Sequence, residues 1–115
     1  MNKNCLFCKI INKEIESEML YEDDEMVAFS DINPQAPVHV LIVPKKHIPK
    51  VSDLNEENKD IVSKLIVLAN RLAKDLQIKD DGYRLVFNCG ANAGQEVPHL
   101  HLHLLGGRVF SWPPG

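Results

Sequence analysis

The chain has 115 residues, of which 44% are hydrophobic and 25% charged, with a formal net charge of −3 at pH 7. These values predict one globular domain over residues 1–115, and the acidic balance argues against nucleic-acid binding, which favours a basic face. No apolar run reaches the roughly 18–20 residues of a membrane span, and no signal peptide is recognisable, so we expect a cytoplasmic protein. In that reducing compartment the three cysteines are not expected to form structural disulfides.

The N-terminal part of the chain predicts a short helix and two strands. Residues 5–12 carry apolar side chains at helical spacing, with Leu6 and Ile10 facing inward. Residues 18–22 and 25–30 have strand patterns on either side of a turn made by two aspartates. The second strand divides into two faces, Met26, Ala28 and Ser30 on one, Val27, Phe29 and Asp31 on the other.

A stiff loop leads from these strands to the strand that we expect at the centre of the sheet. Residues 33–37 contain two prolines, which cannot donate strand hydrogen bonds. Residues 38–43 are almost all β-branched or apolar, which is typical of a strand covered on both faces, and Pro44 is expected to end it.

The second half of the chain predicts one long helix and two more strands. The helix is expected over residues 53–76, with Ser52 or Asn55 as its N-cap and a wide apolar stripe packed on the sheet. Strands are expected at 83–88 and 99–105, separated by a loop with two glycines. The order of elements predicts an α+β domain with a mainly antiparallel five-stranded sheet.

The most informative stretch is the run His99-Leu100-His101-Leu102-His103-Leu104-Leu105. Strict alternation places the leucines on one face of a strand, toward a core, and the imidazoles on the other, toward water or a site. The first and third histidines would lie about 13 Å apart, so one zinc with bonds of about 2.0–2.1 Å cannot bind all three.

A histidine nucleophile is the chemistry that this strand favours. Imidazole exchanges protons near neutrality and forms covalent intermediates with acyl or phosphoryl groups, and no serine or cysteine lies beside the run to take that role. His39 begins the central strand and would join the cluster if the two strands are close in the sheet.

The loop before the histidines and one aspartate are candidates for binding a nucleotide. The glycines of residues 88–96 would let backbone N–H groups approach a phosphate, although no Gly-Lys-Ser/Thr sequence is present, which disfavours a P-loop. Asp31 can accept hydrogen bonds from a ribose diol, or it can simply begin the turn before Pro34.

The histidine run resembles the His-φ-His-φ-His-φ-φ signature of the histidine triad (HIT) family, where φ is apolar. Residues 29–37 and 44–48 look like the family's upstream blocks, and residues 104–108 with the terminal Trp112-Pro113-Pro114-Gly115 resemble its Hint branch. The resemblance covers nearly the whole chain. It implies a HIT-like fold that dimerises into a continuous sheet, and hydrolysis of purine nucleoside 5′-phosphoramidates at the α-phosphate without a catalytic cofactor.

The resemblance also implies roles for individual residues. His101 would attack the α-phosphorus, and His39 and His103 would steady and polarise the site. The second nitrogen of His101 would be held by a backbone carbonyl. The implied nucleotide-binding set comprises His101, His103 and Glu96, together with Asp31 at the ribose, Phe29 and Ile32 near the base, Asn88, Gly94 and Val97 at the phosphate, and Trp112 reaching the site of the partner in the homodimer.

One position departs from the family pattern. Many Hint relatives have serine or threonine where this chain has Glu96, and that hydroxyl can meet the leaving group. A glutamate can donate a hydrogen bond there only while protonated, so the handling of the leaving amine is an open point of the prediction.

A second site is expected at the N-terminus. Cys5-Leu6-Phe7-Cys8 has the spacing of a zinc knuckle but supplies only two of the four ligands of a structural site, and two free cysteines are the alternative. Some members of the HIT superfamily complete such a site with a later histidine and the first histidine of the triad. By that resemblance the ligands here would be Cys5, Cys8, His47 and His99, holding a structural zinc ion.

Three other functions remain open at this stage. A dinucleoside polyphosphate hydrolase of the same superfamily is one, although the terminal Trp-Pro-Pro-Gly favours the Hint branch. A non-catalytic module that binds nucleotides or a partner protein is the second. The third is a metal-dependent hydrolase with the triad as ligands, which predicts loss of activity with a chelator.

Overall fold

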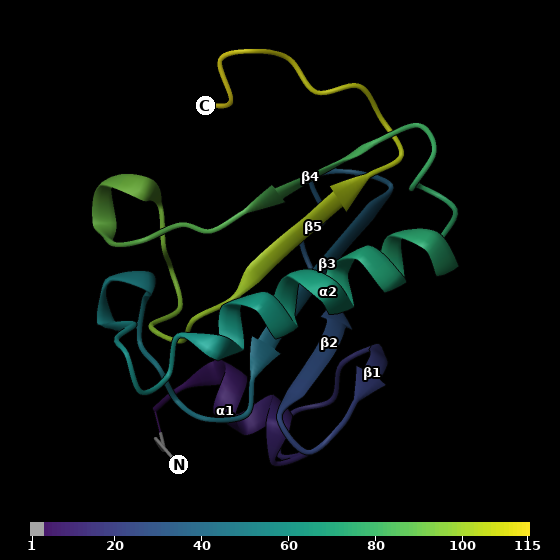
Figure 1. The fold of residues 1–115 in the computed structure, drawn as a ribbon. Helices are drawn as coiled ribbons and strands as arrows, with labels where there is room; N and C mark the ends of the chain where they lie inside the picture. The colour runs from purple at the N-terminus through teal and green to yellow at the C-terminus, as the bar shows by residue number, and fades with distance from the viewer. Residues whose placement is uncertain (1–3) are drawn as a thin grey trace.

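The structure is a computed structural model that describes residues 4–115. Its five strands form one sheet in the order β1-β2-β3-β5-β4, and each neighbouring pair is antiparallel (Figure 1). This confirms the predicted α+β class. The elements are α1 Leu6–Ile11, β1 Met19–Glu22, β2 Met26–Ser30, β3 Val38–Pro44, α2 Asp60–Asp75, β4 Tyr83–Val86 and β5 Leu102–Gly106, with short 3₁₀ turns at Val51–Asp53 and Ala91–Ala93.

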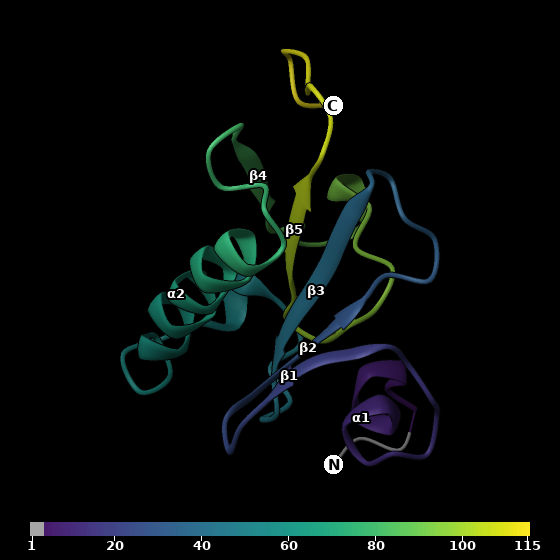
Figure 2. The ribbon, with the colours of Figure 1, turned by 90° about the vertical axis from the view of Figure 1, so that its right-hand side faces the viewer.

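The sheet separates two apolar clusters, as the alternation in its strands requires. Figure 2 shows α2 on one side of the sheet and α1 on the other. Leu102 and Leu104 of β5 pack with Leu65 on the α2 side. Phe29 and Leu41 pack on the α1 side, where α1 contributes its apolar residues. The predicted division of the residues of β2 into two faces is therefore confirmed.

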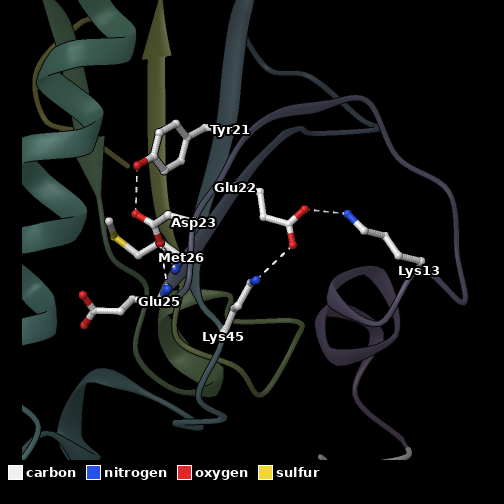
Figure 3. A network of polar contacts seen from close by, with 7 residues as sticks. All are labelled: Lys13, Tyr21, Glu22, Asp23, Glu25, Met26 and Lys45. Atoms are coloured by element: carbon white, nitrogen blue, oxygen red, sulfur yellow. Dashed lines mark hydrogen bonds and ion pairs between the residues drawn. The ribbon is translucent and has the colours of Figure 1, made fainter.

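The tight turn between β1 and β2 is organised by Asp23 (Figure 3). Its Oδ1 accepts hydrogen bonds from the backbone N–H groups of Glu25 and Met26, both at 2.7 Å, and its Oδ2 accepts one from the Tyr21 hydroxyl. An aspartate that bonds the backbone two and three residues ahead stabilises a turn locally. The position of the predicted acidic turn follows from this local bonding.

Glu22 links three parts of the chain that enclose the α1 side. Its carboxylate lies 2.7 Å from Nζ of Lys13, just after α1, and 2.9 Å from Nζ of Lys45, just after β3 (Figure 3). The two lysines lower the pKa of Glu22 through their hydrogen bonds. Such exposed ion pairs are screened by solvent and contribute little to stability.

The long helix begins later than predicted. Residues 51–53 form the 3₁₀ turn, and α2 starts at Asp60. Asn55 caps a separate turn before α2 rather than the helix itself. Its Oδ1 accepts hydrogen bonds from the N–H groups of Glu57 and Asn58. Because Leu54 adopts an extended conformation, with ψ of 142°, the helix cannot run back through it. The predicted C-terminal end is confirmed, since Leu76 is the C-cap.

The histidine strand is also shorter than predicted. Ladder pairing begins at Leu102, opposite Ile42, so His99 and His101 precede β5. The N–H of His99 donates to Val97 O and that of Leu100 to Ile48 O, which takes these backbone groups away from the sheet. Alternation nevertheless continues, because Leu100 packs on the α2 side while the rings of His99 and His101 lie against Phe7 of α1.

Two smaller predictions are corrected by the exposure of side chains and by strand length. Leu6 is 43% exposed rather than inward-facing, because it lies at the mouth of the cavity described below. The strand predicted over residues 83–88 ends at Val86, where its pairing with His103 ends. No helix in residues 4–115 is long and apolar enough to cross a membrane.

Candidate active site and metal centre

A cavity of about 670 Å³ lies between α1, the start of β5 and the segments that follow β2 and β4. Its volume is that of a typical small-molecule site. The structure brings ten of the predicted catalytic and nucleotide-binding residues to its wall. These are Phe29, Asp31, Ile32, His39, Asn88, Gly94, Glu96, Val97, His101 and His103.

His101 lies in the wall of the cavity with a defined proton arrangement. Its side chain is only 7% exposed, and its Nδ1 lies 2.6 Å from the carbonyl oxygen of His99. A carbonyl only accepts, so Nδ1 carries the proton and Nε2 keeps its lone pair. The ring of Phe7 meets the imidazole edge-on with centroids 5.0 Å apart, which limits its rotation. Burial lowers the pKa of His101, which favours the neutral, nucleophilic form near neutral pH.

His39 and His103 form a second imidazole pair with a defined direction of hydrogen bonding. The backbone N–H of Gln35 donates to His39 Nδ1 at 3.0 Å, so His39 carries its proton on Nε2. That Nε2 lies 2.9 Å from His103 Nδ1, which therefore accepts. The proton of His103 is consequently on its own Nε2. This buried atom has no hydrogen-bond partner within residues 4–115, so it can donate to a phosphate oxygen in the cavity.

Burial and the neighbouring imidazoles keep this pair uncharged. Burial lowers the pKa of His103 to about 4, with smaller contributions from His101 and His39. Burial also lowers the pKa of His39, although the carboxylate of Asp31 opposes that shift. The site therefore presents neutral imidazoles in fixed tautomers at neutral pH.

Asp31 is held at the edge of the cavity by its own turn. Its N–H continues the ladder by donating to His39 O, and its Oδ1 accepts a hydrogen bond from the N–H of Asn33. Oδ2 lies 3.4 Å from His39 Nε2. The geometry is compatible with both interpretations of Asp31, as a residue that begins a turn and as an acceptor for a ribose. One oxygen stabilises the turn, and the side chain also lines the cavity.

The glycine loop uses its own backbone groups more than predicted. The N–H of Gly90 donates to Gln95 Oε1, and that of Gly94 donates to Ala91 O, so neither is free to bind a phosphate. Gly90 and Gly94 have φ of 86° and 82°, which explains glycine at both positions. Gly94 and Val97 still line the cavity, so any backbone donation to a ligand must come from the later part of the loop.

Two predicted residues lie away from the buried part of the site. Ile32 lines the mouth of the cavity with its side chain fully exposed. Trp112 is 83% exposed and does not line the cavity, and the C-terminal segment that carries it runs away from the sheet (Figure 1). A role for Trp112 in the site of a partner subunit stays a prediction.

Sequence reasoning missed Gln35 and the contribution of α1 to the site. Gln35 acts through a backbone N–H, which no side-chain pattern reveals. Leu6, Phe7 and Ile10 line the cavity, but the helical spacing of residues 5–12 indicated only a packed face. The adjacent Cys5-x-x-Cys8 was the available signal, because a metal knuckle that includes a histidine of the triad must bring α1 beside the active site.

A separate cluster at the N-terminal end of α1 could hold a metal ion. One ligand atom from each of Cys5, Cys8, His47 and His99 lies within 4.8 Å of all the others. Nδ1 of His99 is 3.3 Å from Cys5 Sγ and 3.2 Å from His47 Nδ1, and Cys8 Sγ is 3.3 Å from His47 Nδ1. A tetrahedral zinc ion with bonds of about 2.0–2.3 Å keeps its ligand atoms roughly 3.3–3.8 Å apart.

The proton arrangement of His99 also fits a metal ligand. Its Nε2 donates to the carbonyl of Pro44 at 2.8 Å, so Nδ1 keeps its lone pair and points at the two cysteines. The imidazole is completely buried, which lowers its pKa to about 4. Cys5 also begins α1, since its sulfur accepts a hydrogen bond from the N–H of Cys8. The donor set and spacing match a structural zinc site with no open position.

A third group of possible ligands, Asp31, His39 and His103, is less suited to a metal ion. The Gln35 N–H points at His39 Nδ1, so Nε2 must carry the proton and its lone pair is not available to a cation. This geometry argues against a metal ion held by Asp31, His39 and His103.

Comparison with known proteins agrees with this geometry. Residues 12–110 match the HIT domain. The chain is 46% identical to the purine nucleoside phosphoramidase of Escherichia coli over 94% of its own length and 91% of that protein. A HIT family hydrolase from Legionella pneumophila has 50% identity and a TM-score of 0.95, covering 97% of this chain and 100% of that one.

A HIT family hydrolase from Clostridium thermocellum is similarly close, with 52% identity, a TM-score of 0.94 and 96% of both chains covered. These matches extend over nearly all of the sequence and include the imidazole cluster whose geometry is described above. The chain therefore belongs to the histidine triad family.

Proposed function

We propose that this protein is a hydrolase that cleaves the P–N bond of purine nucleoside 5′-phosphoramidates through a nucleotidyl-histidine intermediate on His101. The observation that carries the proposal is the buried His101, with Nδ1 bound to a carbonyl and the lone pair of Nε2 left for attack. The 46% identity with a protein named purine nucleoside phosphoramidase supports the choice of substrate.

The proposed reaction has two steps. His101 Nε2 attacks the α-phosphorus, and the P–N bond breaks with its electron pair moving to the amine nitrogen, which takes up a proton from solvent. Water then attacks the same phosphorus and loses a proton to solvent, the P–N bond to His101 breaks with its electron pair returning to Nε2, and the nucleoside monophosphate is released. His103 Nε2–H donates to a phosphate oxygen, where it offsets the charge that develops in both steps.

The remaining residues of the cavity bind the nucleotide. The carboxylate of Asp31 accepts hydrogen bonds from the ribose, Phe29 and Ile32 contact the base, and Val97 lies toward the phosphate. Glu96 is exposed at the same wall and faces the amine side, where it accepts a hydrogen bond from the leaving group. A zinc ion held by Cys5, Cys8, His47 and His99 would supply structural cross-linking only.

The substitution His101→Ala tests the nucleophile. We expect the release of amine from adenosine 5′-phosphoramidate to fall about a thousandfold or more, because the covalent step is lost. The binding of AMP, measured by titration calorimetry, should change little. The substitution Lys74→Ala, at the far end of α2, is the control and should leave both measurements unchanged.

Turnover by His101→Ala within a few-fold of the original would refute the covalent mechanism. A comparison of rates on adenosine phosphoramidate and diadenosine polyphosphate tests the substrate class. A higher kcat/KM for the polyphosphate would favour the alternative hydrolase, and tight AMP binding with no turnover of either would favour a binding module.

A further inference from the structure

Gln35 connects the active site to the C-terminal segment through its backbone. Its N–H donates to His39 Nδ1 at 3.0 Å, and its C=O accepts a hydrogen bond from Arg108 Nε, also at 3.0 Å. Arg108 lies two residues after the end of β5 and does not line the cavity. One residue of the loop between β2 and β3 thus has the His39 imidazole on one side and the Arg108 guanidinium on the other.

The loop is held from the same side by a second contact. Gly107 has φ of 89°, and a Cβ at this position would lie only 2.9 Å from Cβ of Pro37. Glycine therefore lets the chain after β5 approach the loop closely enough for Arg108 to reach Gln35. This packing is independent of the hydrogen bond and fixes the same loop.

The side chain of Arg108 is itself restrained. Its guanidinium lies over the ring of Phe110 at 4.2 Å, and Arg84 of β4 lies over that ring at 4.9 Å. Arginine suits such a position because its planar group can stack while Nε still donates in the plane. Stacking on Phe110 thus restrains the exposed Arg108 side chain in the orientation in which Nε reaches Gln35.

This chain of contacts determines which nitrogen of His39 is protonated. As long as the Gln35 N–H points at His39 Nδ1, a proton on Nδ1 would place two N–H groups against each other. The proton of His39 therefore stays on Nε2. His39 can then donate to His103, and His103 can donate to the substrate. If the loop moves, His39 can adopt the Nδ1–H tautomer. It then no longer donates a hydrogen bond to His103.

We propose that Arg108 is a positioning residue, which holds the Gln35 backbone so that His39 stays in the Nε2–H tautomer. The importance of this for turnover rests on the proposed function, whereas its effect on the tautomer does not. The titratable groups that face His39 are Asp31, which follows β2, and His103 on β5.

The test uses Arg108→Met, which keeps the apolar stem and removes the donor. Long-range ¹H–¹⁵N spectra of the full chain at pH 7.5 should show His39 Nδ1 unprotonated in the original protein and partly protonated in the variant. With adenosine 5′-phosphoramidate, kcat should fall about three- to tenfold, the size expected for one lost hydrogen bond, with KM within about twofold.

The pH profile supplies a readout that a general loosening of the fold would not change. Once Nδ1 is released from the Gln35 N–H it can accept a proton, so the acid limb of the kcat profile should move to higher pH in Arg108→Met. The matched control is Arg84→Met, which removes the other cation on Phe110 but has no contact with Gln35. It should leave the tautomer and the pH profile unchanged.

Two results would overturn the proposal. One is an unchanged His39 tautomer and acid limb in Arg108→Met. The other is an equal change in Arg84→Met, which would assign the effect to the whole C-terminal segment. If the original protein does not hydrolyse the phosphoramidate, the proposed function fails, while the tautomer measurement still decides the role of Arg108.

Discussion

Three histidines of this protein share one arrangement: a backbone group binds one ring nitrogen and leaves the other for chemistry. The carbonyls of Pro44 and His99 accept from His99 Nε2 and His101 Nδ1, and the Gln35 N–H donates to His39 Nδ1. Each backbone partner selects a tautomer. As a result, His99 Nδ1 faces the cysteines, His101 Nε2 faces the cavity, and His39 Nε2 faces His103.

The low pKa of His103 predicts how stability depends on pH. The unfolded chain binds a proton at this residue below about pH 6.5, whereas the folded chain binds it only near pH 4. The unfolded state therefore binds more protons between these values, and the free energy of unfolding falls as the pH falls from 6.5 toward 4.

Removing this titrating group should make that dependence weaker. In His103→Gln we expect the slope of the unfolding free energy against pH to be shallower over this interval, by at most about 1.4 kcal/mol per pH unit. Urea unfolding at several pH values measures the slope, with Lys74→Ala as the control. An unchanged slope in His103→Gln would show that His103 titrates normally.

At this scale the sequence predicted side chains well and backbone partners poorly. The alternation of His99, His101 and His103 with leucines predicted an imidazole face, and in the structure these three side chains do lie on one side of the sheet. The Gln35 N–H and the role of Gly107 depend on how two distant loops approach each other. No local pattern in residues 33–37 encodes that approach, because it results from the pairing of β3 with β5.

Among the elements, α1 depends most on contacts from outside itself. It has only six residues, from Leu6 to Ile11, which is too short to be stable alone in water. The packing of Phe7 on Phe29 and the Cys5–Cys8–His47–His99 cluster supply these contacts. A metal ion in this cluster would therefore stabilise one wall of the cavity.

Metal removal tests this dependence. Protein purified without chelator should contain about one equivalent of zinc, and Cys8→Ser should lose it and lower Tm by roughly 5–15 °C. Cys89→Ser is the matched control, because Cys89 is exposed and outside the cluster, and it should keep both the zinc and the Tm. Less than a tenth of an equivalent of zinc, with both thiols freely titratable, would contradict the site.

The boundaries of elements were harder to predict than their faces. The stripe of α2 was predicted because burial repeats with the helical period, and Leu65, Leu68 and Leu72 are buried. Its start was misplaced because Asn55 is as good a cap for an isolated turn as for a helix. Such turn chemistry depends on the conformation of Leu54, which the local sequence does not determine.

For the whole molecule, the family resemblance predicts a homodimer, and the single described chain leaves Trp112 in solvent. Trp112 is the sole tryptophan of the sequence, so its fluorescence reports on the C-terminal segment alone. We expect sedimentation to give about twice the 13.0 kDa mass of the chain, and the addition of AMP to change the emission of Trp112.

These two measurements separate the predictions about assembly. A monomer at micromolar concentration would contradict the homodimer. A dimer whose Trp112 emission does not respond to AMP, although calorimetry shows binding, would contradict the role of Trp112 in the site of the partner.

His99 belongs to both sites: its side chain faces the cysteines, and its carbonyl binds His101 Nδ1. Any coupling between two ligand sites is reciprocal. If metal binding changes the affinity for a nucleotide by some factor, the nucleotide must change the affinity for the metal by the same factor. Nucleotide saturation would then alter how readily a chelator removes the metal. The protein would in that way couple nucleotide binding to metal retention without a conformational change.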